Sequence, residues 1–172
     1  LMWTLKIFSM PLNYKTYTQS IEIQSKRGVA KEIPIDAITK AVTYTHEVFN
    51  KFIEFEVDVF SILGMRNLSA FVGEVFAQSL SKFSEGLLIS NPHQDGYPDL
   101  LLMDDNGKAD WERLRTNLKA KAPFSPFPNG GVEIKSTCGS VPTPEICRKK
   151  GVEKPSMGDQ RISVLTGYDW KA

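Results

Sequence analysis

The chain has 172 residues, of which 41% are hydrophobic and 24% are charged, and its formal net charge at pH 7 is +1. This length and composition exclude an intrinsically disordered chain and predict one domain with a hydrophobic core. Only two cysteines are present, which excludes a disulfide framework and favours a reducing cytoplasm. The sequence has no apolar run long enough for a membrane-spanning helix. The near-neutral net charge argues against a non-specific polyanion binder.

The first half of the chain is expected to form a hairpin followed by two helices. Residues 15–24 and 29–35 mix apolar with polar side chains around a turn at 25–28, which favours two paired strands. Apolar residues then recur at mostly helical spacing over 36–64. They follow the i, i+3, i+4, i+7 rule over 67–86, which predicts a second helix with one apolar face.

The second half is expected to consist of short strands and loops with one helix. In chain order we expect a loop over 91–98, a buried strand over 100–103, a turn over 104–107, a surface helix over 111–121, a strand containing Glu133 and a strand over 162–166. Helices first, and then strands with a helix between them, describe a mixed α/β domain.

The domain organisation follows from this order of elements. We expect a single domain over 1–172, with mainly N-terminal strands and two helices in 1–86 and the sheet region in 87–172. Because the chain stops shortly after a strand, we also expect it to be a fragment that lacks C-terminal elements.

Three charged residues at the expected strands have side chains suited to phosphodiester hydrolysis. Residues two apart in a strand point to the same side, so Glu133 and Lys135 share one face. The carboxylates of Asp99 and Glu133, with the backbone carbonyl of Ile134, offer the oxygen ligands that Mg²⁺ prefers. Lys135 can orient the attacking water and stabilise charge on phosphorus. On its own, the Glu-x-Lys pattern is also typical of an ordinary half-buried strand.

The pattern Pro98-Asp99 … Glu133-x-Lys135 resembles the motif of the PD-(D/E)xK nuclease superfamily, which includes most type II restriction endonucleases. The run 95–101 and the small residues after Lys135 resemble restriction endonucleases in particular. The resemblance implies a restriction-endonuclease-like mixed central sheet flanked by helices. It also implies a protein that needs no membrane and no organic cofactor. It implies a prokaryotic, cytoplasmic homodimer that cleaves double-stranded DNA in an Mg²⁺-dependent reaction and leaves 5′-phosphate ends.

An N-terminal helix often contributes one more acidic residue to the site in this superfamily. Glu74 matches that residue by its position in the second expected helix, beside the apolar stripe. A solvated helical glutamate is the other interpretation of Glu74, and the sequence leaves both open.

The densest basic stretch of the chain follows the Glu133 strand directly. Such residues can hold phosphates, and Arg or Gln side chains can read base edges. The residues expected to contact DNA are Arg148, Lys149, Lys150, Lys154, Gln160 and Arg161. The alternative for each of them is a position in a solvated loop.

Other functions fit the same residues. One is a structure-specific repair or recombination nuclease, which would cleave branched DNA. Another is a non-catalytic DNA-binding domain of the same fold, which would bind DNA without Mg²⁺ and without cleavage. A zinc site built from His93, Asp95 and Asp99 is disfavoured, because no fourth ligand lies near them in the sequence.

Overall fold

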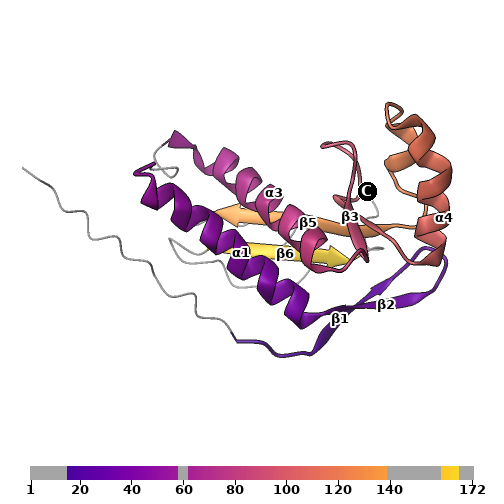
Figure 1. The fold of residues 1–172 in the computed structure, drawn as a ribbon, viewed down its shortest axis with the longest axis horizontal. Coiled ribbons are helices and arrows are strands. Elements are labelled where there is room, and N and C mark those ends of the chain that lie inside the picture. Colours follow the sequence, from indigo (N-terminus) through magenta and orange to yellow (C-terminus); the bar gives the residue numbers. More distant parts are fainter. Residues whose placement is uncertain (1–14, 58–61, 139–159, 167–172) are drawn as a thin grey trace, which may run out of the picture.

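The computed structural model describes residues 15–57, 62–138 and 160–166 of the chain. These residues form three α-helices and six strands, and the strands are arranged in two antiparallel sheets (Figure 1). The prediction of a mixed α/β protein is confirmed at this level. No helix among the described residues has the length and apolar character needed to cross a membrane.

The N-terminal hairpin consists of β1 (Ser20–Gln24) and β2 (Ala30–Pro34), which pair in antiparallel register. The predicted hairpin is therefore confirmed. Ile23 and Ile33 are fully buried, whereas most of their neighbours in the two strands are exposed. These two isoleucines attach the hairpin to the main core of the protein.

Two long helices follow, α1 (Ile35–Glu54) and α3 (Met65–Phe83), and they lie side by side across one face of the larger sheet (Figure 1). The prediction that the first helix continues to Gly64 is wrong. Glu56 has a φ of 58°, which is incompatible with a continuing right-handed helix. The chain therefore leaves the helix before this residue.

The main core lies between the two helices, the hairpin and the sheet. It buries apolar side chains from all of these elements, and this shared burial stabilises the fold. Its members are Ile23, Ile33, Ala37, Ala41, Phe76, Ala77, Leu80, Leu88, Leu100, Leu102, Val132 and Ile134.

The larger sheet contains β3 (Leu88–Ser90), β4 (Leu100–Leu102), β5 (Gly131–Cys138) and β6 (Gln160–Thr166) in that order. Each described strand runs antiparallel to its neighbours, whereas a mixed sheet was predicted. The physical reason is that β3, β4 and β5 are joined by connections that return the chain along the adjacent strand, without the crossover that a parallel pair needs.

The helix α4 (Asp105–Leu114) begins where a turn was predicted, so that prediction is wrong. Asp104 is its N-cap residue, and its Oδ1 accepts a hydrogen bond from the Gly107 amide at 2.8 Å. Two single-turn 3-10 helices follow, η1 (Arg115–Asn117) and η2 (Ala122–Phe124). A second cluster packs here against the other side of β4. Its members are Leu101, Met103, Phe124 and Phe127, with Ile89, Trp111 and Leu114 beside them.

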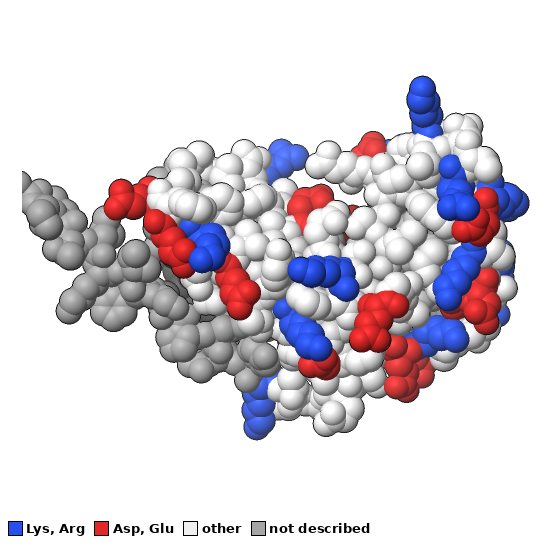
Figure 2. Space-filling view, viewed as in Figure 1, with Lys and Arg blue, Asp and Glu red and all other residues white. Residues whose placement is uncertain are grey.

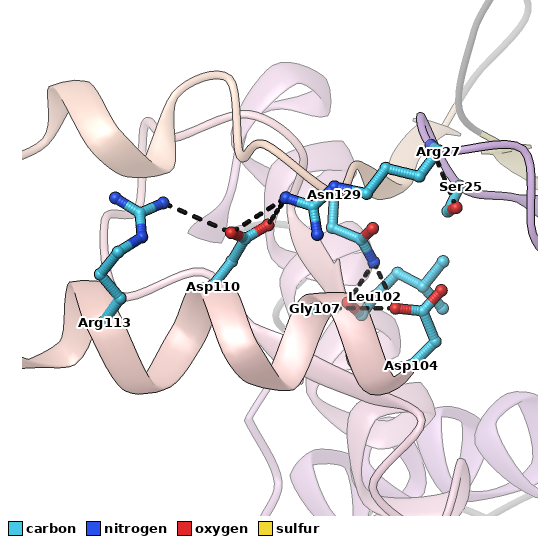
Figure 3. Close-up of polar contacts among 8 residues, drawn as sticks. All are labelled: Ser25, Arg27, Leu102, Asp104, Gly107, Asp110, Arg113 and Asn129. Atoms are coloured by element: carbon cyan, nitrogen blue, oxygen red, sulfur yellow. Dashed lines mark hydrogen bonds and ion pairs between the residues drawn. The ribbon is translucent and has the colours of Figure 1, made fainter.

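Asp110 is a buried carboxylate that links α4 to the N-terminal hairpin (Figure 3). Its two oxygens accept hydrogen bonds from Arg27 Nη2 at 3.1 and 2.9 Å, and Oδ1 also accepts one from Arg113 Nη2 at 3.3 Å. We expect Asp110→Ala to lower the free energy of unfolding by about 1–3 kcal/mol, because charge-assisted hydrogen bonds to a buried acceptor are lost. Urea unfolding followed by circular dichroism measures this change.

Lys51→Ala is the matched control for this prediction. Both side chains of its ion pair with Glu54 are exposed, and such pairs contribute less than about 1 kcal/mol to the free energy of unfolding. A loss of stability in Asp110→Ala no larger than that in Lys51→Ala would contradict the proposed contribution of Asp110.

Candidate active site

Asp99 lies directly before β4, and the pairing of β4 with β5 places it beside Glu133. The register pairs Leu100 with Val132, so the next position along both strands brings Asp99 opposite Glu133. The Oδ2 atom of Asp99 accepts a hydrogen bond from the Ile134 amide at 2.6 Å. The structure therefore holds the predicted aspartate against the strand that carries the predicted Glu-x-Lys pair.

Glu133 and Lys135 share one face of β5, as the period of a strand predicts. Lys135 Nζ donates a hydrogen bond to Glu133 Oε1. Glu133 is only 8% exposed, and its Oε2 atom is buried without a hydrogen-bond partner in the part of the chain that the structure describes. An unpartnered carboxylate oxygen at this position is suited to a cationic ligand.

The pKa of Glu133 is raised above its usual range, chiefly because burial disfavours the charged carboxylate. The Lys135 ammonium and the Asp99 backbone act in the opposite direction, and the negative charge of Asp99 raises the pKa further. Burial and the Asp99 carboxylate together raise the pKa of Glu133 by more than Lys135 lowers it. A positive ion between the two carboxylates would relieve the same repulsion.

Ile134 supplies both core packing and a backbone oxygen at the site. Its side chain belongs to the main core, and its amide points towards Asp99. Because the N–H and C=O of one residue in an extended strand point to the same side, the Ile134 carbonyl faces the Asp99 edge of β5. The role of this carbonyl as a metal ligand stays a prediction.

Glu74, on α3, lies within electrostatic reach of Asp99. The helix comes close to β5 at this point, since a Cβ atom on Gly73 would lie 3.3 Å from Ser136 Cβ. The pKa of Glu74 is raised, first by desolvation and then by the negative charge of Asp99. Figure 2 shows acidic atoms at the bottom of a notch between the parts of the molecule that Figure 1 labels α3 and β3.

Tyr97 also belongs to this group of residues, although the sequence did not single it out as a site residue. Burial raises the pKa of its hydroxyl, as do the charges of Glu133 and Asp99, while Lys135 lowers it. Its amide donates to Ser125 Oγ at 3.1 Å, which fixes the backbone. The only sequence signal was its position two residues before Asp99, and that position does not by itself show where the ring lies.

The predicted DNA-binding residues are distributed differently. Arg148, Lys149, Lys150 and Lys154 lie outside the described residues. Gln160 and Arg161 begin β6, where they pair with Cys138 and Thr137. They therefore lie at the opposite end of the β5–β6 ladder from Glu133, which pairs with Leu165.

Three of the basic residues around α4 lie beside acidic side chains. Arg113, Arg115 and Lys121 each form an ion pair with an acidic residue. Figure 2 shows the resulting mixture of positive and negative side chains over this end of the molecule.

No group of three His, Cys, Asp or Glu side chains converges as a metal site within 15–57, 62–138 and 160–166. Asp95 pairs with Lys121 at 2.6 Å, and the His93 ring packs against Phe124 with centroids 5.6 Å apart. Magnesium has other requirements, because one or two carboxylates with substrate and water oxygens are sufficient.

A scan against protein-family models, a search of curated proteins and a search of solved structures each found no match to this chain. The function must therefore be inferred from the geometry of Asp99, Glu133, Ile134 and Lys135.

Proposed function

We propose that this protein is a Mg²⁺-dependent endonuclease that cleaves double-stranded DNA in the manner of a type II restriction enzyme. One observation carries the proposal: the Ile134 amide holds Asp99 against β5, beside a buried Glu133 that has one unpartnered oxygen and contacts Lys135. The strand that follows Asp99, β4, is the sheet neighbour of β5, which carries Glu133 and Lys135, and this adjacency supports the proposed motif.

The proposal gives each residue of the site a role. The carboxylates of Asp99 and Glu133 and the carbonyl of Ile134 would hold Mg²⁺, and Glu74 adds negative charge near them. When bound, Mg²⁺ would supply a water of lowered pKa and would neutralise charge on the scissile phosphate. Lys135 orients the attacking water and stabilises negative charge on phosphorus. No covalent enzyme intermediate is required.

The substrate and assembly follow from the same proposal. Cleavage leaves 5′-phosphate ends, and a twofold homodimer would cut one strand with each subunit at a palindromic site. Residues 148–161 would contribute contacts to DNA phosphates and bases. Restriction of foreign DNA is a cytoplasmic activity of prokaryotes, and the two cysteines of the chain suit a reducing compartment.

Incubation of the full chain with plasmid and phage DNA tests this function. We expect discrete fragments in Mg²⁺ and none in EDTA, because the carboxylates alone cannot activate water. Asp99→Ala and Lys135→Ala should each reduce the cleavage rate by about 100-fold or more, since each removes a group that acts on the developing charge. Gel electrophoresis of timed samples measures the rates.

Lys51→Ala is again a matched control, because Lys51 also pairs with a glutamate but lies on the exposed face of α1. It should cleave at the wild-type rate. Undiminished cleavage by Asp99→Ala would exclude the proposed site. Cleavage confined to branched DNA would identify a structure-specific nuclease. DNA binding that does not depend on Mg²⁺ and is not followed by cleavage would identify a non-catalytic domain.

A further inference from the structure

Asn91 occupies the position directly across from Asp99 in the sheet. It follows β3, and the β3–β4 register that pairs Ser90 with Leu100 continues for one more position. The Asn91 amide donates a hydrogen bond to the Asp99 carbonyl oxygen at 2.9 Å. The backbone of Asn91 therefore holds the peptide group on the C-terminal side of Asp99.

The side chain of Asn91 holds the peptide group on the other side of Asp99. Its Nδ2 atom donates to the Pro98 carbonyl at 3.0 Å and to the Phe124 carbonyl at 2.9 Å. Its Oδ1 atom accepts a hydrogen bond from the His93 amide at 3.0 Å. Both hydrogens of the amide are used, and a flipped side chain would place an oxygen against two carbonyl oxygens.

Gly96 provides the space in which the Asn91 side chain lies. A Cβ atom at position 96 would lie 2.6 Å from both Nδ2 and Oδ1 of Asn91, which is closer than such atoms approach one another. Any larger residue at this position would displace the amide. Asn91 and Gly96 are therefore spatially matched within the loop that leads to Asp99.

We propose that Asn91 is a positioning residue that directs the Asp99 carboxylate towards β5, and that Gly96 is required for this contact. Two peptide planes flank the Asp99 Cα atom, and Asn91 holds both. Their orientation determines where the side chain points, and the observed orientation lets Oδ2 accept from Ile134. The inference rests on the proposed function for its catalytic consequence, but the positioning itself has a separate readout.

The direct test compares the Ile134 amide in the full-length wild type and Asn91→Ala by NMR. We expect its proton resonance to move upfield and its hydrogen exchange to accelerate by about tenfold or more, because the carboxylate acceptor is no longer held in place. The Leu102 amide, which donates to the Gly130 carbonyl, is an internal reference and should change little. Gly96→Ala should reproduce the effect, and an unchanged Ile134 amide in both variants would overturn the proposal.

The catalytic test measures how cleavage depends on Mg²⁺ concentration. Loss of an orienting partner typically weakens metal affinity by about 10- to 100-fold, so the Mg²⁺ concentration for half-maximal cleavage should rise by that factor in Asn91→Ala. Asn129→Ala is the matched control. The Asn129 amide also bridges two acceptors, Leu102 O at 3.2 Å and Asp104 Oδ1 at 2.7 Å, but neither belongs to the site (Figure 3).

The two arms separate the possible failures. Asn129→Ala should lower stability and leave the Mg²⁺ midpoint unchanged. An equal shift of the midpoint in both variants, or no shift in Asn91→Ala, would overturn the contribution of Asn91 to Mg²⁺ binding while leaving the nuclease proposal intact. A wild-type protein that does not cleave DNA would overturn the nuclease proposal, and the Ile134 amide would then decide the positioning role by itself.

Discussion

Glutamine in place of Glu133 is expected to slow Mg²⁺-dependent cleavage by about 100-fold or more and to make the folded protein more stable at pH 7. Burial raises the pKa of Glu133 in the folded state by more than the Lys135 contact lowers it. The ionised carboxylate is therefore less favourable in the folded protein than in the unfolded chain. This cost to stability develops as the pH rises through the unfolded-state pKa, and it is complete above the raised folded-state pKa. Glutamine has a similar shape and no charge, so it removes the cost.

Urea unfolding of wild type and Glu133→Gln over a range of pH measures this effect. The stability gain should be present at pH 7 and should shrink as the pH falls through the usual glutamate pKa of about 4.3, where the carboxylate is protonated in both states. The cleavage rate at pH 7 should fall by about 100- to 1,000-fold or more, because the site loses a charged oxygen ligand.

Glu112→Gln is the control, because Glu112 is 60% exposed in its ion pair with Arg115. Its effect on the free energy of unfolding at pH 7 should be below about 1 kcal/mol, and cleavage should be unchanged. If Glu133→Gln were less stable than wild type at pH 7, the Lys135 ion pair would outweigh burial and our interpretation of Glu133 would be wrong.

Alanine in place of Gly131 is expected to separate Asp99 from Glu133 by disrupting the pairing of β4 with β5. A Cβ atom at position 131 would lie 1.9 Å from the Leu100 carbonyl oxygen and 2.8 Å from Pro98 Cγ. The obstructing atom is backbone, so a rotamer change cannot relieve the clash. We expect a loss of about 3 kcal/mol or more in the free energy of unfolding, together with loss of cleavage. Denaturant unfolding and the plasmid assay measure the two losses.

Gly64→Ala is the matched glycine substitution, because a Cβ atom there would have no neighbour within 4 Å. Gly64 is the N-cap of α3, so a change of at most about 1 kcal/mol and full cleavage activity are expected. Comparable losses in both variants would show that the close approach of β4 to β5 at Gly131 is unimportant for the site.

The elements that sequence reasoning predicted well are those with local and periodic causes. The apolar stripe of α3 follows helical spacing, and Glu133 and Lys135 share a face because a strand has a period of two. The hairpin β1–β2 follows from two short strands joined by a turn. These features depend on neighbours a few residues apart, which the sequence contains directly.

The errors occurred where one local signal is compatible with two structures. Asp104 and the residues after it have turn-forming side chains, but an aspartate is equally favourable as a helix N-cap. The neighbouring contacts select the helix, since Asn129 from a distant loop donates to the capping carboxylate at 2.7 Å. The apolar pattern after Glu54 likewise continued beyond the actual end of α1.

The amino-acid sequence by itself determined that Glu133 and Lys135 are neighbours on one face of a strand and that Asp99 precedes another, because strand geometry is local. Only the tertiary structure decided that these strands pair in the register that brings Asp99 opposite Glu133. It also decided that Asn91 holds both peptide groups around Asp99, and that α3 brings Glu74 within reach. These contacts join residues far apart in the chain, and the packing of the core and the hydrogen bonds between strands select them.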